Sequence, residues 1–415
     1  MGEPRPSREL RRVVIAGNGV AGTLAAETLR KERPDLEVQV VAEEPYPLYN
    51  RVALPRLLRG DLPEQRVFMR DPEHHLRMGY AIHFATRIVR VDAAERVVYT
   101  SGEREDVLPF DALIVATGGR PSPLRVPGAE PRPEGLVYFQ TLDDTRHILG
   151  LISRARRAVT VGGSYIAYEL TEGLRRRGLE VTWLMRGPHF LRRVLEEQGG
   201  LLVDRIAADH GVEVIHGEEV ASLVVQGGAV RGVVTTAGRT LEAQVVACGL
   251  GLSFSTELLQ GSGVEIGKGV RTDETLATNI PGIYAAGDVA EFFDAFLERH
   301  HTMGTWDNAS THGRLAALNV LGANQPLREV PSYTSTLFDS TLYVLGLTPE
   351  YDPGLESVVR VDMGQRQYRR LFFRGEHLVG AVMIGDRGGR RILKQMIRNR
   401  EKVPEADRTA LLSVQ

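Results

Sequence analysis

Two glycine-rich loops and one Gly-Asp pair are the residues of this chain whose types and spacing point most directly to chemistry. The loops lie in VVIAGNGVAG, from Val13 to Gly22, and in AVTVGGSYIA, from Ala158 to Ala167, and the pair closes GIYAAGD at Asp288. Each loop follows a short apolar run and precedes a helical pattern, as in dinucleotide-binding folds. Two such loops in one chain predict two dinucleotides placed against each other, and hydride transfer between a nicotinamide and a flavin is the natural chemistry.

The first loop has the complete glycine pattern of a dinucleotide site, with the residues Gly17, Gly19, Val20, Ala21 and Gly22. The first glycine permits a tight turn, the second lets the backbone approach a pyrophosphate, and the third lets helix and strand pack closely. Glu43 lies 21 residues after Gly22, near the spacing expected for a carboxylate that binds ribose hydroxyls. We therefore predict a dinucleotide at this loop.

The second loop departs from the pattern, because its three glycine positions hold Gly162, Ser164 and Ala167. Serine at the middle position narrows the approach to a pyrophosphate, although its hydroxyl offers a hydrogen bond. The same predicted site includes Gly163, Tyr165 and Ile166 in the loop and Gly249 after a later strand. A degenerate loop that no longer binds nicotinamide is the alternative.

The strand after the second loop ends in Arg186, where a ribose-binding carboxylate is usual, and Arg192 follows closely. Arginine suits a 2′-phosphate better than a pair of ribose hydroxyls. The sequence therefore favours NADPH, with NADH as the alternative. Asp288, after a strand and a glycine, is placed to accept a hydrogen bond from the ribityl chain of a flavin cofactor.

Composition excludes several other classes of protein. The 415 residues carry a net charge of −2, which gives no general field to attract nucleic acid or an anionic membrane. The single cysteine, Cys248, rules out an internal disulfide, a CxxC pair and a cysteine metal cluster. The N-terminus has no apolar core of a secretory signal, and no apolar run approaches the ~20 residues of a membrane span. We expect a soluble, cytoplasmic protein that contains no metal site.

The order of elements predicts an α/β fold with an internal repeat. Apolar runs at 13–16, 38–42, 112–115, 158–161, 181–185, 245–247 and 283–286 are typical of buried parallel strands, and helices are expected at 23–32, 166–177 and 308–321. From residue 325 the composition changes to aromatic and β-branched runs at 332–345, 368–373 and 378–384, followed by a helix at 390–400. Two Rossmann-like dinucleotide-binding domains plus a C-terminal α+β domain are therefore expected.

This arrangement resembles the glutathione-reductase-fold flavoproteins, and among them the ferredoxin, rubredoxin and nitrite reductase flavoproteins. The resemblance covers nearly the whole chain. It implies a discontinuous FAD domain at 1–117 and 243–324, an NAD(P)H domain at 118–242 and a C-terminal domain at 325–415. The segment YNRVALPR resembles the family's YxRPPLSK element, which implies that Arg51 lies by the FAD pyrophosphate and that Arg56 replaces the lysine near flavin N5.

Further site residues come from the same resemblance. In GGSYIAYE, Glu169 matches the glutamate that pairs with that lysine, which implies an Arg56–Glu169 pair beside the flavin, and Tyr165 matches the tyrosine that gates the nicotinamide pocket. Ile88 falls where the backbone contacts adenine. Other matches are Thr117 and Gly118 in the ATG turn and Trp306 at a helix start by the flavin.

The resemblance implies an FAD-dependent NAD(P)H oxidoreductase that passes electrons to an iron–sulfur carrier such as ferredoxin or rubredoxin. In one group of alternatives, NAD(P)H reduces the flavin in the same way, but the electrons pass to a quinone, a nitrite reductase subunit or oxygen. A flavoprotein used as a binding or signalling module and a structural subunit with an inactive nicotinamide site also stay open. The sequence leaves the choice between monomer and homodimer open.

Overall fold

The structure is a computed structural model that describes residues 9–103, 105–295, 298–385 and 388–414. The polar N-terminal residues 1–8, on which the expectation about a secretory signal depends, lie outside the described residues. Within the described part of the chain, no helix combines the length and the apolar character that a bilayer span requires.

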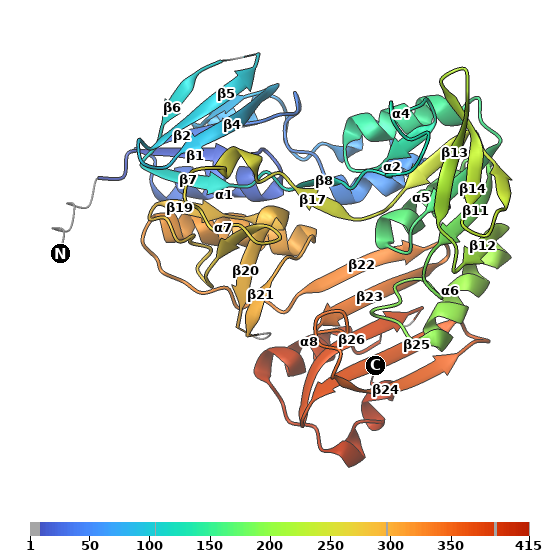
Figure 1. Ribbon diagram of the computed structural model, residues 1–415. Coiled ribbons are helices and arrows are strands. Elements are labelled where there is room, and N and C mark those ends of the chain that lie inside the picture. Colours follow the sequence, from blue (N-terminus) through green and yellow to red (C-terminus); the bar gives the residue numbers. More distant parts are fainter. Residues whose placement is uncertain (1–8, 104, 296–297, 386–387, 415) are drawn as a thin grey trace. The chain divides into compact units, whose positions relative to one another are not determined.

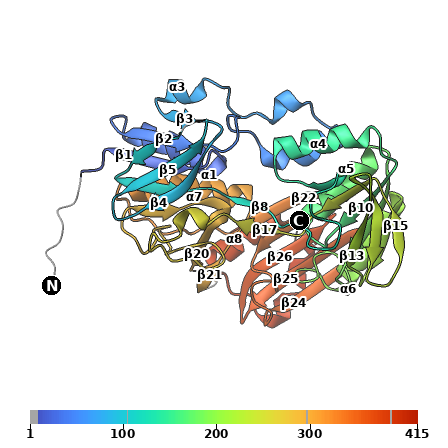
Figure 2. The same cartoon turned by 45° about the horizontal axis from the view of Figure 1, so that its top comes forward.

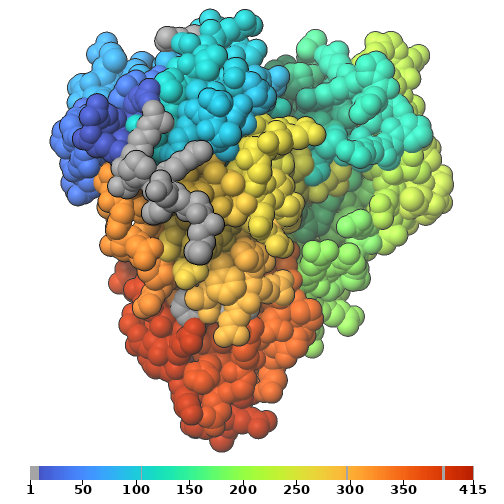
Figure 3. Space-filling view, turned by 60° about the vertical axis from the view of Figure 1, so that its left-hand side comes forward, coloured from blue at the N-terminus to red at the C-terminus, as the bar shows by residue number. Residues whose placement is uncertain are grey.

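The chain divides into two compact units that exchange segments. Unit 1 comprises residues 1–50, 65–120 and 253–329, and unit 2 comprises residues 51–64, 121–252 and 330–415. Each unit is therefore assembled from stretches far apart in the sequence. Figure 3 shows this for unit 1, where the blue and cyan N-terminal segments share one continuous surface with the yellow and orange residues of 253–329.

Unit 1 is built on a five-stranded parallel sheet with the order β19-β7-β1-β2-β3. Its strands are β1 (Arg12–Ala16), β2 (Glu37–Val41), β3 (Ala81–His83), β7 (Ala112–Val115) and β19 (Ile283–Ala285). Most residues of β1 and β7 are buried, as expected for central parallel strands covered on both faces. Helices α1 (Val20–Glu32) and α7 (Trp306–Val320) pack against each other beside this sheet (Figure 1).

Two smaller sheets complete unit 1. One contains β4 (Thr86–Asp92), β5 (Val97–Gly102) and β6 (Val107–Pro109), and the other contains β18 (Val270–Thr272), β20 (Ala290–Asp294) and β21 (Arg299–His301). Apolar side chains of both sheets join those of β1 and β7 in one core. The remaining elements of this unit are α3 (His74–Met78), η2 (Glu64–Val67, which begins at the unit boundary), η3 (Glu257–Leu259) and η4 (Gly287–Val289).

Unit 2 repeats the parallel architecture with the strand order β12-β11-β10-β16-β9. These strands are β9 (Leu136–Tyr138), β10 (Arg157–Val161), β11 (Glu180–Met185), β12 (Val212–His216) and β16 (Val245–Cys248). The helices are α2 (Leu54–Arg59), α4 (Leu142–Ile152), α5 (Tyr165–Arg176) and α6 (Glu197–Asp209). The start of α4 is defined by a capping box, in which Thr141 and Asp144 bond each other's backbone N–H.

The C-terminal part of unit 2 is an antiparallel sheet with the order β22-β23-β26-β25-β24. Its elements are β22 (Ser332–Leu337), β23 (Ser340–Gly346), β24 (Glu356–Asp362), β25 (Gln367–Arg374), β26 (His377–Ile384) and α8 (Arg390–Asn399). The strands of this sheet lie beside the parallel sheet of unit 2 and α6 (Figure 2). Its side chains share a core with those of α5 and α6. A second core lies between the sheet and α8.

Short elements complete the chain. They are η1 (Arg51–Ala53), β8 (Gly119–Pro121), β13 (Val220–Gln226), β14 (Ala229–Thr235), β15 (Thr240–Glu242), β17 (Leu252–Phe254), η5 (Glu405–Asp407) and η6 (Ala410–Ser413). The predicted α/β fold with two Rossmann-like cores and a C-terminal antiparallel domain is confirmed. The predicted strand run at 332–345 is in fact a hairpin. Strand β24 was not predicted: it contains three valines, Val358, Val359 and Val361, but they do not alternate strictly and charged residues stand among and beside them. The predicted three-domain boundaries stay a prediction.

Candidate functional site

The first glycine loop connects β1 to α1 through two close backbone approaches. Gly17 has φ +112°, and a Cβ on it would overlap the Ala116 carbonyl oxygen. A Cβ on Gly22 would overlap the Gly17 carbonyl oxygen. Both positions therefore require glycine, because a side chain would collide with backbone atoms that cannot move aside.

The middle glycine of this loop serves a different purpose. Nothing lies within 4 Å of a Cβ built on Gly19, and no side chain caps the first turn of α1, which begins at Val20. Nearby, the buried Thr117 hydroxyl at the end of β7 has no hydrogen-bond partner among the described residues. An open space at a helix N-terminus, with an unsatisfied hydroxyl beside the same loop, fits the pyrophosphate of FAD. Gly118, with φ +64°, completes the turn after Thr117.

The Gly287–Asp288 turn lies against the start of α1. A Cβ on Gly287, which has φ +77°, would come within 3.1 Å of the Ala21 Cβ. Asp288 is half-buried, and its carboxylate faces Gly304 just before α7. Trp306 is half-buried at the first position of α7. The structure thus brings the predicted residues Ala21 and Asp288 to one region of unit 1.

Two other predicted FAD residues have partners that the sequence did not indicate. The Glu43 carboxylate forms an ion pair with the Arg120 guanidinium, with a closest distance of 2.6 Å. Arg120 follows the predicted Thr117-Gly118 turn by two residues. Its positive charge was the feature of the sequence that could have pointed to this ion pair. Ile88 lies on β4, and its side chain is buried in the core. In the antiparallel pairing of β4 with β5, Ile88 lies opposite Thr100. The adenine contact predicted for its backbone stays a prediction.

The second loop connects β10 to α5 and has the same first turn. Gly162 has φ +125°, and a Cβ on it would overlap the Gly249 carbonyl oxygen. The Ser164 hydroxyl donates to that carbonyl at 2.7 Å and accepts from the Ala167 N–H at 3.4 Å. Ser164 therefore caps α5 and ties the loop to the end of β16. Its hydroxyl already has two backbone partners, rather than standing open for a pyrophosphate.

Aromatic residues on and after β11 pack together and support the second glycine loop through a hydrogen bond. The Trp183 indole N–H on β11 donates to the Gly162 carbonyl at 2.7 Å, and the Leu191 N–H donates to the Gly163 carbonyl at 3.1 Å. Phe190 packs its ring against Trp183, with ring centroids 5.5 Å apart. The segment after β11 is thereby folded back onto the loop. These supports were not predicted, since nothing in the spacing of Trp183 marks it.

Arg186 and Arg192 lie at the two ends of a short turn beyond β11. Both are exposed, and the Arg192 side chain covers Gly187, where its Cδ lies 2.8 Å from the position that a Cβ would take. Arg193, the next residue, instead faces Glu350 at 3.9 Å. The two predicted arginines are thus adjacent at the carboxyl end of β11, the edge where dinucleotides bind in such sheets.

Glu169 lies one turn after Tyr165 on α5 and faces β22. Its carboxylate accepts from the Ser335 hydroxyl at 3.2 Å and from the Tyr333 hydroxyl at 3.4 Å, and the rings of Tyr165 and Tyr333 are 4.1 Å apart. Enclosure by protein raises the pKa of Glu169 to about 7, although these hydroxyls and the charge of Arg59 act in the opposite direction. Within unit 2, the carboxyl group is therefore poised to exchange a proton near neutrality.

The expected Arg56–Glu169 pair is not formed among the described residues. Arg56 is exposed on α2, and the cation on α2 that faces α5 is Arg59, one turn further along the helix. Arg59 donates to Glu172 at 3.3 Å and to Thr336 at 3.0 Å. Residues three apart lie on the same side of a helix, so the two arginines differ in their position along α2 rather than in direction. Arg59, at the last position of α2, is the one that reaches Glu172 of α5 and Thr336 of β22.

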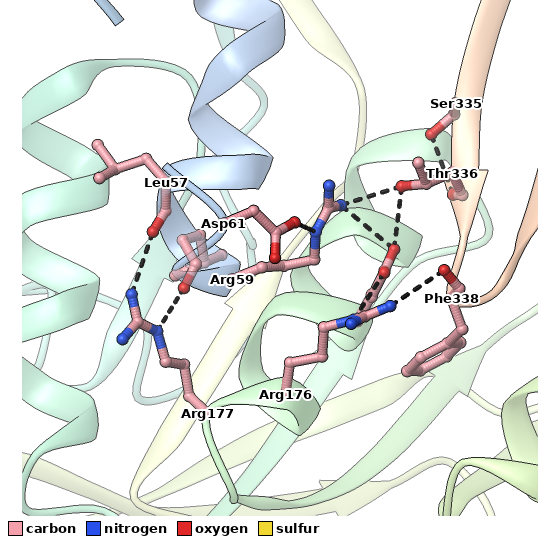
Figure 4. Close-up of polar contacts among 10 residues, drawn as sticks. Leu57, Arg59, Asp61, Arg176, Arg177, Ser335, Thr336 and Phe338 are labelled. Atoms are coloured by element: carbon pink, nitrogen blue, oxygen red, sulfur yellow. Dashed lines mark hydrogen bonds and ion pairs between the residues drawn. The ribbon is translucent and has the colours of Figure 1, made fainter. Parts of the chain in front are cut away.

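Arg59 belongs to a buried polar network that joins α2, α5 and β22 (Figure 4). Glu172 is fully buried and accepts from Arg59 and from Arg176, the latter at 3.0 Å, and from the Thr336 hydroxyl at 3.2 Å. Asp61 also accepts from Arg59, at 2.8 Å. The negative charge of Glu172 is thus compensated by two guanidinium groups, as burial of a carboxylate requires.

Helix α2 is fixed to α5 by two further contacts. The Arg177 guanidinium donates to the carbonyls of Leu58 at 2.6 Å and Leu57 at 3.1 Å at the end of α2 (Figure 4), and the Leu57 carbonyl also accepts from the Gly60 N–H at 3.0 Å. Gly173 leaves room for Leu58, whose Cδ2 lies 2.6 Å from the position of an added Cβ. Just before α2, Arg51 donates to the Gln140 carbonyl at 2.8 Å. Arg51 and Arg56 therefore belong to unit 2, and their predicted contacts with FAD stay predictions.

Two protein-family descriptions match this chain, one over its larger N-terminal part and one over its C-terminal part. Residues 11–313 match the family described as pyridine nucleotide-disulphide oxidoreductase, and residues 331–401 match the rubredoxin NAD+ reductase C-terminal domain. The chain belongs to the pyridine nucleotide-disulphide oxidoreductase family. Its members are FAD-dependent NAD(P)H oxidoreductases, so the predicted family, enzyme class and pair of cofactors are confirmed at this level.

Curated relatives include reductases of several acceptors. The chain is 32% identical to the ferredoxin–NAD(+) reductase component of the anthranilate 1,2-dioxygenase system of Burkholderia cepacia, over 84% of each chain. It is 26% identical to the nitrite reductase [NAD(P)H] of Bacillus subtilis, over 97% of this chain and 49% of that protein. The chain thus spans about half the length of the latter relative. The first of these relatives, named as a ferredoxin reductase, bears out the predicted class of NAD(P)H-dependent flavoenzyme.

Solved structures agree with the fold. Putidaredoxin reductase in its covalent complex with putidaredoxin has a TM-score of 0.87 at 25% identity, over 98% of this chain and 99% of that chain. An engineered water-forming NADPH oxidase with bound NADPH has a TM-score of 0.86 at 22% identity, over 94% of this chain and 91% of that chain. In this family member a dithiol mechanism is unavailable, because the one cysteine, Cys248, is buried on β16 and burial raises its pKa to about 12.

Proposed function

We propose that this protein oxidises NADPH, reduces its own FAD, and passes the electrons to a small iron–sulfur protein of the ferredoxin or rubredoxin type. The observation that carries the proposal is the presence of two dinucleotide loops in one chain, each at the carboxyl edge of its own parallel sheet. FAD, when bound, supplies the step from two-electron to one-electron transfer. The residues of the chain bind and orient the two cofactors.

FAD binding is assigned to unit 1. Gly19 leaves space for the pyrophosphate, the first turn of α1 offers its backbone N–H groups, and Thr117 offers an unsatisfied hydroxyl. Glu43, paired with Arg120, is assigned to the adenosine ribose, and Asp288 to the ribityl chain. In unit 2, the loop at Gly162–Ala167, with Gly249, is assigned to the pyrophosphate of NADPH.

The choice of NADPH rests on Arg186 and Arg192. Relative to its first substitution, from glycine to alanine, the engineered NADPH oxidase carries aspartate-to-alanine, alanine-to-arginine and proline-to-arginine changes 18, 19 and 25 residues further on. In this chain the residues 18, 19 and 25 positions after Ala167 are Met185, Arg186 and Arg192. The same spacing of a neutral residue and two arginines supports a site for a 2′-phosphate.

The first experiment is an anaerobic titration of the purified protein with NADPH and, separately, NADH, following the visible absorbance of the flavin. We expect rapid bleaching by NADPH. In Arg186→Ala and Arg192→Ala, kcat/KM for NADPH should fall by about 10- to 100-fold while kcat/KM for NADH changes little, because each arginine–phosphate contact contributes ~1.5–3 kcal/mol. Arg193→Ala is the matched control, since Arg193 faces Glu350.

Two results would overturn parts of the proposal. A wild-type preference for NADH, with no loss in Arg186→Ala, would remove the NADPH assignment and leave the reductase intact. No bleaching by either nucleotide would favour a flavoprotein that binds or signals without turnover, or a subunit with an inactive nicotinamide site.

The acceptor is tested on the reduced enzyme. Plant-type ferredoxin, rubredoxin, a quinone, nitrite with a nitrite reductase partner, and oxygen are compared as oxidants of the NADPH-reduced protein. We expect an iron–sulfur protein to reoxidise it fastest, in keeping with relatives that serve such carriers. A faster reaction with oxygen or quinone would replace this acceptor. A cytoplasmic location and a monomeric or homodimeric state, with no nucleic-acid or membrane partner, belong to the same proposal and are tested by fractionation and light scattering.

A further inference from the structure

A buried histidine stands behind the Gly287–Asp288 turn of unit 1. His312 lies on α7 with no exposed surface, and its Nδ1 accepts a hydrogen bond from the Gly287 N–H at 3.3 Å. Acceptance at Nδ1 requires the neutral ring with its proton on Nε2. Burial lowers the pKa of His312 to about 3, so this state persists across the range in which flavoenzymes work.

The bond holds a point where three backbone segments meet. Gly287 approaches Ala21 in the first turn of α1, and a Cβ on Gly313 would overlap the Ala21 carbonyl oxygen. Helix α7, the turn before Asp288 and the start of α1 therefore converge on Ala21, next to the loop assigned to the FAD pyrophosphate. His312 is the side chain that joins α7 to the turn.

The other ring nitrogen gives an independent indication that His312 is not simply a core residue. Its Nε2 is buried and has no hydrogen-bond partner among the described residues. An unsatisfied buried N–H costs about 1–3 kcal/mol, so an apolar side chain would suit this core better if packing were its purpose. The cost is tolerated at a position where Nδ1 bonds the turn.

The residue before the turn is held by a bond of its own, because the Ala286 N–H donates to the Val115 carbonyl at 2.9 Å, whereas His312 bonds the turn at Gly287 itself. The Phe292 ring meets the His312 ring edge-on, with centroids 4.7 Å apart. Phe292 also contacts His301, which is bonded through Nε2 to Asp294 at 3.0 Å. His301 and Asp294 act on the pKa of His312 in opposite directions, and burial outweighs both. Phe292 and Asp294 come from β20 and His301 from β21, whereas the Gly287 N–H donates to His312 of α7.

We propose that His312 is a positioning residue for FAD, which holds the Gly287–Asp288 turn against the first turn of α1 by accepting the Gly287 N–H. This inference rests on the assignment of FAD to unit 1. In the absence of the bond, the buried Gly287 N–H would be unsatisfied and Asp288 would lose its fixed approach to the cofactor. The binding of FAD should therefore weaken without a change of any residue that touches it.

The test measures FAD binding to the deflavinated full-length protein by quenching of flavin fluorescence, together with the melting temperature of the apoprotein. His312→Leu should raise the Kd for FAD on the order of tenfold, equivalent to the loss of one hydrogen bond. His312→Asn and His312→Gln keep a side-chain acceptor, and at least one of them should restore the wild-type Kd. His301→Gln is the matched control in the same cluster and should leave the Kd unchanged.

The outcomes separate this inference from the proposed function. If the wild-type apoprotein binds FAD and His312→Leu binds it equally well, the positioning role is wrong and the FAD site stands. If all His312 variants have the same raised Kd for FAD and the same lowered melting temperature, the residue has only a structural role and the inference is again wrong. If the wild-type apoprotein does not bind FAD, the assignment to unit 1 fails first.

Discussion

The two glycine loops solve the same geometric problem with different residues. Gly17 and Gly162 both have large positive φ, and a side chain on either would overlap the carbonyl oxygen of the residue after a neighbouring strand, Ala116 or Gly249. The first turn of a dinucleotide loop is therefore fixed by the approach of two parallel strands. Because this demand comes from the backbone, both copies satisfy it with glycine.

The two loops differ at the second and third positions of the glycine pattern, where the space around the residue is different in each loop. In the first loop, Gly19 faces open space and Gly22 packs against the Gly17 carbonyl. In the second loop, Ser164 bonds the end of β16 and Ala167 carries a methyl group. The comparison teaches that a glycine pattern mixes positions required for folding with positions required for a ligand, and only the structure separates them.

The largest expected effect tests the folding role of the third position. Gly22→Ala should destabilise the apoprotein by about 3 kcal/mol or more, because the methyl group overlaps a backbone carbonyl. The matched change in the second loop, Ala167→Gly, adds no atom and should cost about 1 kcal/mol through helix propensity. Urea unfolding of both apoproteins measures the difference. Equal effects would show that the two helix starts are packed alike.

The second position of the first loop should show the opposite behaviour. Gly19→Val should leave apoprotein stability within ~1 kcal/mol of wild type, since a Cβ there meets nothing within 4 Å and the backbone has φ −69°. The Kd for FAD should rise at least tenfold, because the side chain occupies the space assigned to the pyrophosphate. Fluorescence quenching and urea unfolding give the two numbers. Unchanged FAD binding would place the pyrophosphate elsewhere.

The sequence was sufficient for the fold because buried parallel strands leave a strong signal. The apolar runs at 13–16, 112–115, 158–161 and 245–247 each became a central strand within one residue of the predicted bounds. Such strands are covered on both faces, so their composition alone marks them. By contrast β24, at the edge of the C-terminal sheet, is mostly exposed, and its valines are mixed with charged residues rather than forming a continuous apolar run.

The site was less predictable where a side chain forms a hydrogen bond or ion pair with a residue far away in the sequence. The spacing of the loop residues predicts which backbone positions approach each other. It does not predict that Arg59 rather than Arg56 compensates a buried carboxylate, or that Trp183 donates to Gly162. Those contacts depend on how α2 and β11 pack, and side-chain direction is set only after the helices are docked.

The helices that follow the loops also differ, and Glu169 gives a third test. Helix α1 buries small and apolar residues, whereas α5 carries Glu169 and Glu172 towards β22. Because the pKa of Glu169 is raised to about 7, the folded state favours the protonated group. Its contribution to stability is present below its unfolded pKa of ~4.3 and is lost as the pH rises through about 7.

Glu169→Gln should therefore nearly match wild type in stability near pH 4.5 and exceed it by roughly 3 kcal/mol at pH 8, because each unit of pKa difference between the folded and unfolded states is worth ~1.4 kcal/mol. The amide can still accept from Ser335 and Tyr333, so the hydrogen bonds are kept. Urea unfolding across this range measures the difference. Glu172→Gln is the contrasting variant, because it removes the partner of Arg59 and Arg176 and should destabilise at all pH values. A stability difference between Glu169→Gln and wild type that stays constant with pH would show that folding does not shift the pKa of this carboxyl group.

The smallest expected effect concerns Ser164, where the second loop replaces the open space of the first. Ser164→Ala should lower stability by about 1 kcal/mol, because α5 loses its cap and the loop loses its bond to Gly249. Gly19→Ala, at a position without a side-chain cap, is the matched control and should cost less in the apoprotein. Since the Ser164 hydroxyl already serves the backbone, the Kd for NADPH should change less than about threefold. A tenfold weaker Kd at unchanged stability would mean that the hydroxyl turns to the pyrophosphate on binding, and the two loops would then differ only in which atom meets the ligand.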